Sequence, residues 1–174
     1  MIRRLAIHKL REWRFSEDRK PLIIKGVRQV GKTTLVKEFA KEFDTFLHLN
    51  LERSKDSELF EQTDDVGQLL QSIYFHKKQE KKDGSVLLFI DEIQNSKKAV
   101  AMLRYFYEEA PEVHVIVAGS LLETVMDVRK ISFPVGRVEF MSLRPCSFLE
   151  FLDGLGENFD KELVENFSVE SVVH

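Results

Sequence analysis

The sequence predicts an α/β fold, in which a parallel β-sheet of about five strands carries helices on both faces. Strand-like and helix-like spacings of apolar residues alternate about five times along the chain. The runs at 86–90 and 113–118 are almost continuously apolar, which is typical of strands buried on both sides. Polar motifs follow several of these strands, and ligands of parallel sheets bind at the carboxyl ends of the strands. Function is therefore expected at that edge of the sheet.

Composition limits the class of protein. The 174 residues leave room for one domain, and 43% hydrophobic with 32% charged residues is a globular balance. The single cysteine and the absence of a secretory pattern in the N-terminal stretch predict a cytoplasmic location. A membrane span needs about 20 apolar residues, and no apolar run here is longer than that from Val86 to Ile90, so no membrane partner is expected. A net charge of −3 argues against a positive field over the whole domain for binding nucleic acid.

The chain is expected to form a single domain over residues 1–174, because no Ser/Gly-rich linker divides it. We expect an N-terminal helical segment at 1–20, a nucleotide-binding core at 21–152 and a C-terminal helical segment at 153–174. In the first segment, Leu5, Leu10 and Trp13 would dock on the sheet.

The core consists of alternating strands and helices whose bounds follow from local patterns. The expected strands lie at 21–26, 45–52, 86–90, 113–118 and 137–143. Helical spacing is found at 35–43, 66–74, 100–107, 121–126 and 151–167. Gly26, Pro111 and Gly119 each close an element. Ser147 and Glu150 have the spacing of a capping box, which predicts that a helix begins there.

A phosphate-binding pattern follows the first expected strand. Residues 26–33 read G-x-x-x-x-G-K-T and lead into a helix. A triphosphate needs several N–H donors that converge on its oxygens, and Gly31 lets the loop wrap tightly enough to aim its backbone N–H groups inward. The helix that begins near Lys32 adds the positive end of its dipole, and Lys32 adds a mobile charge for the β- and γ-phosphates. Thr33 offers a hydroxyl to Mg²⁺, which prefers oxygen ligands.

This pattern predicts a site for ATP with Mg²⁺. The residues expected to bind the nucleotide are Gly26, Val27, Arg28, Gln29, Val30, Gly31, Lys32, Thr33 and Thr34. Arg28 could reach the nucleotide or a partner, although solvent is the simpler surrounding for it. The alternative reading is a glycine-rich turn before an ordinary helix, but the composition makes a chance match to this pattern rare.

An acidic pair follows the third expected strand. Asp91 and Glu92 come directly after a run of apolar residues, which is the Walker B pattern. Asp91 can hold Mg²⁺ directly or through a water, so Thr33 and Asp91 are the predicted metal ligands. Glu92 would face the γ-phosphate and orient or deprotonate the attacking water. The alternative is that the pair only caps the next helix.

Ser120 follows the fourth expected strand. Its hydroxyl would lie between the acidic pair and the γ-phosphate, so Ser120 joins Lys32 and Glu92 as a candidate catalytic residue. A helix N-cap is an equally good reading, and the two roles can coexist. The strand at 45–52 is inserted between the phosphate loop and the acidic pair, and a catalytic Glu adjoins the Mg²⁺-binding Asp. Together these features favour the ATPase (ASCE) branch of the P-loop NTPase folds over the nucleotide-kinase branch.

Four segments of the chain resemble one family, the prokaryotic AAA+-like ATPases that usually carry a C-terminal domain of unknown function. They are GVRQVGKTTL at 26–35, FIDEIQ at 89–94, VIVAGS at 115–120 and GRVEFMSLRPCSFLEFL at 136–152. The resemblance covers about residues 3–152, and its last segment is the most specific to the family. It implies ATP binding and hydrolysis on an AAA+ core, with Lys32 and Thr33 at the phosphates and Mg²⁺. Asp91 and Glu92 become the Walker B pair and Ser120 the first sensor.

The resemblance also includes Arg137, which matches the arginine of the family's G-R pair. Its role is either that of a charge sensor or that of a structural anchor. Family members are usually much longer, so the chain is expected to be an N-terminal ATPase portion that ends before a helical lid and the C-terminal domain. Arg129 and Arg137 are candidates for a transition-state arginine, which in oligomeric ATPases often comes from a neighbouring subunit. A homo-oligomer is therefore a candidate assembly, and a surface salt bridge is the alternative for both arginines.

Three other functions compete with an ATPase. A nucleotide-dependent switch would bind ATP and turn it over negligibly, and the substitution Glu92→Gln separates the two. A small-molecule phosphotransferase would need an acceptor pocket and an Arg-rich lid segment, and the sequence shows no such segment. A nucleic-acid-associated protein would use the N-terminal cluster of Arg and Lys, for which a solvated helix face is the simpler reading.

Overall fold

The computed structural model describes residues 4–119 and 132–155. Its centre is a parallel sheet with the strand order β2-β3-β4-β1-β5. The strands are β1 (Leu22–Lys25), β2 (Thr45–Asn50), β3 (Val86–Asp91), β4 (Val113–Ala118) and β5 (Glu139–Ser142). The predicted parallel sheet is confirmed, and β4 lies between β1 and β3. This separation of the loop strand from the acidic-pair strand is the ASCE arrangement that the sequence predicts.

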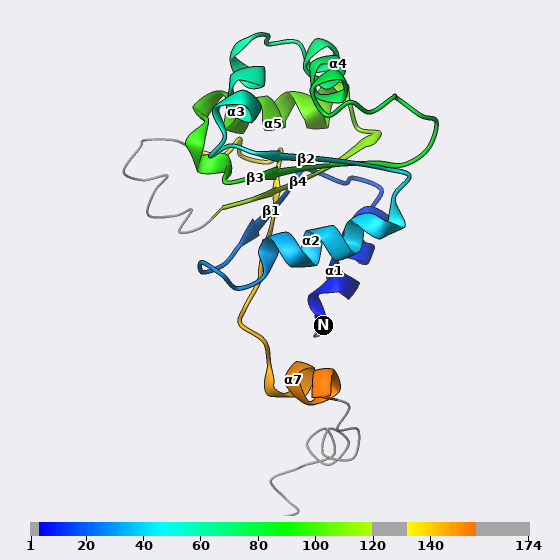
Figure 1. Cartoon of the computed structure of the whole chain (residues 1–174), viewed down its shortest axis with the longest axis vertical. Coiled ribbons are helices and arrows are strands. Elements are labelled where there is room, and N and C mark those ends of the chain that lie inside the picture. Colours follow the sequence, from blue (N-terminus) through cyan, green and yellow to red (C-terminus); the bar gives the residue numbers. More distant parts are fainter. Residues whose placement is uncertain (1–3, 120–131, 156–174) are drawn as a thin grey trace, which may run out of the picture.

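Helices cover both faces of the sheet, as Figure 1 shows. One face carries α3 (Ser54–Glu61), α4 (Val66–His76) and α5 (Lys97–Glu109). The other carries α1 (Ala6–Arg14) and α2 (Lys32–Phe39), and α7 (Phe148–Leu155) follows β5. Short 3-10 helices lie at η1 (Ala40–Glu42) and η2 (Ile93–Asn95). No helix in the described ranges is both long enough and apolar enough to cross a bilayer.

Two hydrophobic cores lie on the two faces of the sheet. Successive residues of β1 alternate between them, since Ile23 packs in the core under α3, α4 and α5, whereas Leu22 and Ile24 pack against α1 and α2. All six residues of β3 are buried, as are all six of β4. The nearly continuous apolar runs that predicted these strands are therefore explained by helices on both sides.

Local predictions hold for most elements, with two differences. Leu10 and Trp13 are buried as expected, but Leu5 is 57% exposed and Ile7 takes its place, because Ile7 and Leu10 lie three residues apart on one face of α1. The second difference is α3, which the sequence patterns did not predict. Few of its residues are buried, so its sequence shows no clear apolar stripe. The expected helix at 121–126 and the helical spacing beyond Leu155 lie outside the described residues.

The predicted capping box at the start of α7 is confirmed. The backbone N–H of Ser147 donates to Glu150 Oε2 at 2.8 Å, and the N–H of Glu150 donates back to Ser147 Oγ at 3.2 Å. The helix therefore begins where the sequence predicts.

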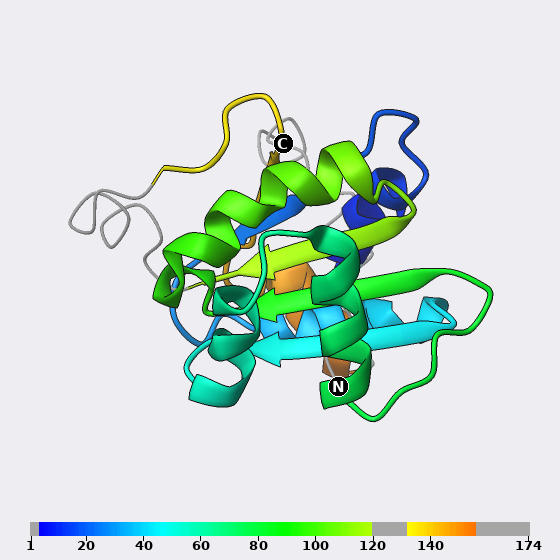
Figure 2. The ribbon, with the colours of Figure 1, turned by 90° about the horizontal axis from the view of Figure 1, so that it is seen from above.

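The register of the sheet brings the ends of three strands to one level. Ile90 of β3 lies beside Val117 of β4, and Ala118 lies beside Ile24 of β1. Figure 2 shows β2, β3 and β4 running in the same direction. The residues that directly follow β1 and β3 consequently meet at a single edge.

Candidate functional site

The loop at 26–31 joins β1 to α2 and turns sharply. Gln29 and Gly31 both have positive φ angles, of 63° and 97°. At Gly26 the backbone of the segment after β5 approaches closely, and an added Cβ would lie only 2.6 Å from the carbonyl oxygen of Leu143. A side chain at this position would have to displace backbone, so the glycine is required for packing as well as for the motif.

Lys32 points back into this loop. Its Nζ donates hydrogen bonds to the carbonyl oxygens of Gly26 at 2.8 Å and Val27 at 3.0 Å, and the residue is only 7% exposed. Burial lowers the pKa of Lys32 from its ordinary value, while the nearby carboxylates of Glu92 and Asp91 act in the opposite direction. The loop thus encloses the terminal nitrogen of a buried lysine within reach of two acidic side chains.

The helix α2 begins at Lys32 without a side-chain cap. Its N-cap residue is Gly31, which has no side chain to accept from the first-turn N–H groups. Those N–H groups and the positive end of the helix dipole face the same region as the lysine. Such an arrangement favours a bound anion.

Thr33 and Asp91 place two oxygen donors beside the loop. Thr33 Oγ1 donates to Asp91 Oδ2 at 2.7 Å, and Asp91 Oδ1 accepts from the N–H of Glu92 at 3.1 Å. Among the described residues no three Asp, Glu, His or Cys side chains cluster as a metal site. One hydroxyl and one carboxylate nevertheless fit Mg²⁺, which takes few protein ligands and completes its shell with phosphate oxygens and water.

Glu92 begins the turn after β3 in a left-handed conformation, with φ 55° and ψ 45°. Its Oε2 accepts a hydrogen bond from Nε2 of Gln94, a residue that is buried. The side chain of Glu92 is therefore oriented by the residue two positions further on. No role was predicted for Gln94 from the sequence. Its position two residues after Glu92 was the signal that could have indicated this contact.

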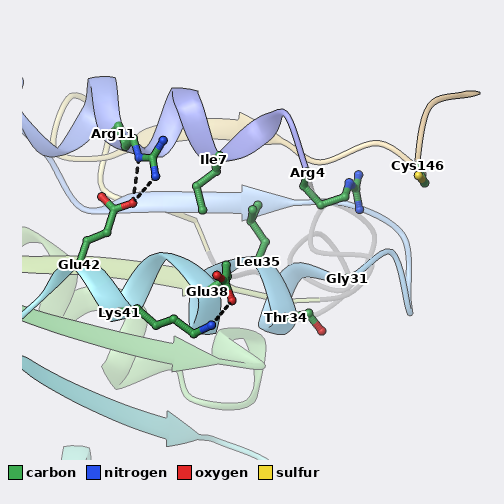
Figure 3. A pocket seen from close by; sticks show the side chains of 10 residues that line it. All are labelled: Arg4, Ile7, Arg11, Gly31, Thr34, Leu35, Glu38, Lys41, Glu42 and Cys146. Carbon is green, nitrogen blue, oxygen red and sulfur yellow. Dashed lines mark hydrogen bonds and ion pairs between the residues drawn. The ribbon is translucent and has the colours of Figure 1, made fainter. Parts of the chain in front are cut away.

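A cavity of about 680 Å³ adjoins the loop between α1 and α2 (Figure 3). Gly31 and Thr34 line its end at the loop, and Ile7 and Leu35 contribute apolar walls. The remaining lining residues are Arg4, Arg11, Glu38, Lys41, Glu42 and Cys146. Its size is that of a small-molecule site. Thr34 was predicted from the motif, whereas the α1 residues come from a segment that the motif does not include.

The other predicted loop residues differ in exposure. Val27, Arg28 and Gln29 are exposed, and Val30 is buried. The exposure of Arg28 is compatible with solvent, a nucleotide or a partner, so its role stays a prediction. Ser120 and Arg129 lie outside the described residues, so their roles stay predictions.

Arg137 lies near the amino ends of the parallel strands, whereas the loop lies at their carboxyl ends. It precedes β5, whose Glu139 is in register with Leu22 at the start of β1, whereas the loop follows the end of β1. Arg137 Nε donates to Glu108 Oε1 at 2.7 Å, and this bond raises the pKa of Arg137 and lowers that of Glu108. The structure therefore favours the anchor and salt-bridge readings of Arg137 over a sensor of phosphates bound to its own loop.

Many of the basic side chains of the N-terminal segment have partners within the chain. Arg4 pairs with Glu150, and Arg11 and Arg14 pair with Glu42. Arg19 donates to the carbonyl of Pro111, and Lys20 pairs with Asp18. These contacts favour a structural role for the cluster over a free surface for nucleic acid.

The fold and the loop define a protein of the P-loop class, with an ASCE sheet order. A model of the family described as AAA domain matches residues 18–152, and the chain belongs to that family. Among solved structures, it is similar to the Walker-type ATPase PABY2304 of Pyrococcus abyssi, with a TM-score of 0.56 and 19% identity over 95% of this chain and 63% of that chain. A search of curated proteins finds no match. The chain thus spans less than two thirds of that ATPase, and a likeness at this identity shows the fold.

Proposed function

We propose that this protein binds ATP together with Mg²⁺ and hydrolyses it to ADP and phosphate. The observation that carries the proposal is the side chain of Lys32, which is buried inside the loop and bonded to the carbonyls of Gly26 and Val27. A lysine ammonium beside an uncapped helix start favours a polyanion over any neutral ligand. Membership of the AAA domain family supports the same ligand.

The phosphates and the nucleoside of the bound ATP occupy two neighbouring parts of the site. The loop N–H groups and Lys32 bind the phosphates, with the Lys32 ammonium exchanging its carbonyl partners for phosphate oxygens. The nucleoside occupies the cavity that begins at Gly31 and Thr34, with its base against Ile7 and Leu35. This division explains why the cavity opens directly beside the loop.

The acidic pair divides the remaining tasks. Thr33 and Asp91 hold Mg²⁺, which supplies positive charge to the phosphate oxygens when bound. Glu92 accepts a proton from the attacking water at a carboxylate oxygen, and Gln94 orients that carboxylate from the other side. Because no covalent intermediate is needed, catalysis consists of positioning and of charge stabilisation.

A nucleotide-dependent switch is the second candidate function. The observation that favours it is the hydrogen bond from Gln94 to Glu92. If that bond keeps the carboxylate turned away from water after ATP binds, the protein holds ATP without appreciable turnover.

Calorimetric titration with Mg·ATP tests the proposed binding. We expect Lys32→Ala to weaken affinity at least about tenfold, because the ammonium that meets the phosphates is lost. Lys37→Ala is the matched control, since Lys37 lies on the same helix but is exposed. Equal affinity in wild type and Lys32→Ala contradicts the proposal.

Phosphate release then separates the two candidate functions. Release by the wild type that Lys32→Ala abolishes supports hydrolysis at this site. Tight binding without release assigns the switch instead. Melting curves of both variants show whether the fold is retained.

A further inference from the structure

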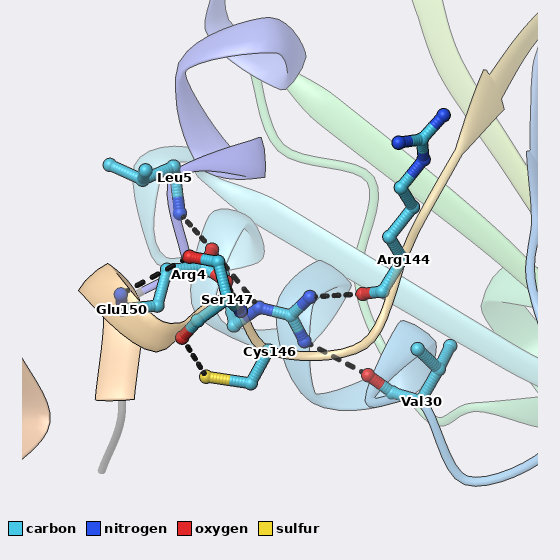
Figure 4. A network of polar contacts seen from close by, with 7 residues as sticks. All are labelled: Arg4, Leu5, Val30, Arg144, Cys146, Ser147 and Glu150. Atoms are coloured by element: carbon cyan, nitrogen blue, oxygen red, sulfur yellow. Dashed lines mark hydrogen bonds and ion pairs between the residues drawn. The ribbon is translucent and has the colours of Figure 1, made fainter. Parts of the chain in front are cut away.

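Arg4 ties three separate segments together beside the phosphate loop (Figure 4). Its Nη1 donates to the carbonyl oxygen of Val30 at 2.9 Å, its Nε donates to Glu150 Oε1 at 3.2 Å, and its Nη2 donates to the carbonyl of Arg144. Each nitrogen of the guanidinium thus has its own acceptor. Because the guanidinium is planar and rigid, the three bonds fix one another in direction, which the single ammonium of a lysine cannot do.

Glu150 holds the guanidinium of Arg4 in place from the side of α7. The Glu150 side chain is only 7% exposed, and its Oε1 also accepts from the N–H of Leu5 at 2.7 Å. Burial acts to raise the pKa of Glu150, but the N–H groups of Ser147 and Leu5 and the charge of Arg4 hold it below its ordinary value. The ion pair is therefore largely buried and well bonded, so removing one partner leaves the other charge uncompensated.

The Val30 carbonyl belongs to the peptide bond that leads into Gly31. In a planar trans peptide the C=O and the N–H point in opposite directions. A hydrogen bond that holds the Val30 oxygen toward Arg4 therefore turns the Gly31 N–H away from Arg4. Gly31 has φ 97° and no side chain, so its own backbone preferences restrain this peptide weakly.

We infer that Arg4 is a positioning residue for nucleotide binding: by holding the Val30 oxygen, it aims the Gly31 N–H into the loop at the phosphates. The inference rests on the proposed ATP site. Glu150 acts one step further out, because it keeps the guanidinium in the orientation that reaches Val30. The orientation of one loop amide is thus set by a residue just before α1 and, through it, by a residue of α7.

Three variants test this role by calorimetric titration with Mg·ATP and with Mg·ADP. Arg4→Lys keeps the charge but loses the three-way geometry, and Glu150→Gln loosens Arg4 without contacting the loop. Arg14→Lys is the matched control: Arg14 is the last residue of α1, the helix that Arg4 precedes, its side chain is 17% exposed against 15% for Arg4, and it also donates to a backbone carbonyl, that of Glu42. Melting temperatures are measured for each variant.

We expect Arg4→Lys to bind ATP and ADP each about tenfold more weakly, and by the same factor, because the loop amides serve phosphates that both nucleotides contain. Glu150→Gln should weaken both in the same proportion, by a smaller factor. The nucleotide affinity of Arg14→Lys should stay within about twofold of wild type, even where its melting temperature falls as far as that of Arg4→Lys. This comparison separates positioning from a general loss of stability.

Three results would overturn the inference. They are an affinity of both Arg4→Lys and Glu150→Gln within about twofold of wild type, an equal loss in Arg14→Lys, or a loss for ATP without a loss for ADP. The proposed function fails separately, when the wild type binds no nucleotide or when Lys32→Ala binds as well as wild type. Should Arg4→Lys fail to fold, Glu150→Gln decides by the same criteria.

Discussion

Thr33 Oγ1 donates a hydrogen bond of 2.7 Å to Asp91 Oδ2, although 58 positions separate the two residues in the chain. Thr33 lies in the first turn of α2, and Asp91 is the last residue of β3. They meet because β4 lies between β1 and β3 with its end at the same level as theirs. The two oxygen donors of the proposed Mg²⁺ site are therefore in contact before any ligand is considered.

This contact predicts how Mg²⁺ affects ATP binding. In Thr33→Ala and in Asp91→Asn we expect ATP affinity to respond to Mg²⁺ about tenfold less than in wild type, because a donor to the cation is lost. Titrations with ATP in excess Mg²⁺ and in EDTA measure the response. Thr33→Ser keeps the hydroxyl and should behave as wild type. An undiminished Mg²⁺ response in both variants would remove these residues from the metal site.

The proposed general base predicts a separation of binding from turnover. Glu92→Gln should lower the rate of phosphate release at least about 100-fold and leave Mg·ATP affinity nearly unchanged, because the amide cannot accept the proton of the water. Glu109→Gln, at the exposed end of α5, is the control for the loss of one negative charge. Release that proceeds equally fast in Glu92→Gln and wild type would exclude the general base and favour the switch.

The cavity beside the loop predicts an effect of bulk at Thr34. Thr34→Trp should weaken ATP binding about tenfold, because the indole occupies the space proposed for the nucleoside. Thr34 is exposed, so the melting temperature should change little. Lys37→Trp adds the same side chain one turn further along α2, outside the cavity lining. If both variants bind ATP as wild type does, the nucleoside does not lie in this cavity.

The buried ring of His114 predicts that the protein loses stability in mild acid. Its ring packs edge-on against Trp13 and Phe43, and burial, with the charges of Arg19 and Arg14, lowers its pKa from 6.5 to about 4. Above pH 6.5 the folded and unfolded chains both carry neutral His114. Between pH 6.5 and about 4 only the unfolded chain takes up the proton, so the free energy of unfolding falls, by up to about 3 kcal/mol.

Urea unfolding at a series of pH values measures this loss. In His114→Gln the decrease between pH 6.5 and about 4 should be much shallower than in wild type. Part of the slope should remain, because burial also lowers the pKa of His48. His8→Gln, an exposed histidine on α1, is the control and should keep the full slope. Identical slopes in wild type and His114→Gln would show that His114 does not carry the effect.

Local patterns were sufficient for the elements that place the loop and the acidic pair. The apolar run of β3 ends at Asp91, and the loop pattern ends at Lys32 and Thr33, so both motifs were predicted at the edge where they are found. α3 could not be predicted in the same way, because few of its residues are buried. Instead, the buried carboxylate of Asp56 in α3 bonds to His76, the last residue of α4, and to Lys77, the C-cap of α4.

Contacts between distant segments are what local patterns cannot supply. Arg4 and Glu150 were interpreted as part of a basic segment and as a capping residue, and only the folded chain brings them together at the Val30 carbonyl. Arg137 belongs to a motif that resembles the family's, yet the register of β5 places it near the amino ends of the strands, whereas Lys32 lies beyond the carboxyl end of β1. Both outcomes depend on strand order and register.

The amino-acid order alone decided which chemical groups this protein has: the phosphate loop with its lysine, and the acidic pair at the end of an apolar strand. Those are encoded locally, since a turn, a helix start and a strand end each depend on a few adjacent residues. The partners of each group, from Thr33 with Asp91 to Arg4 with Val30, were decided by the tertiary structure. They arise from the packing of elements that are far apart in the chain, and local spacing carries no information about that packing.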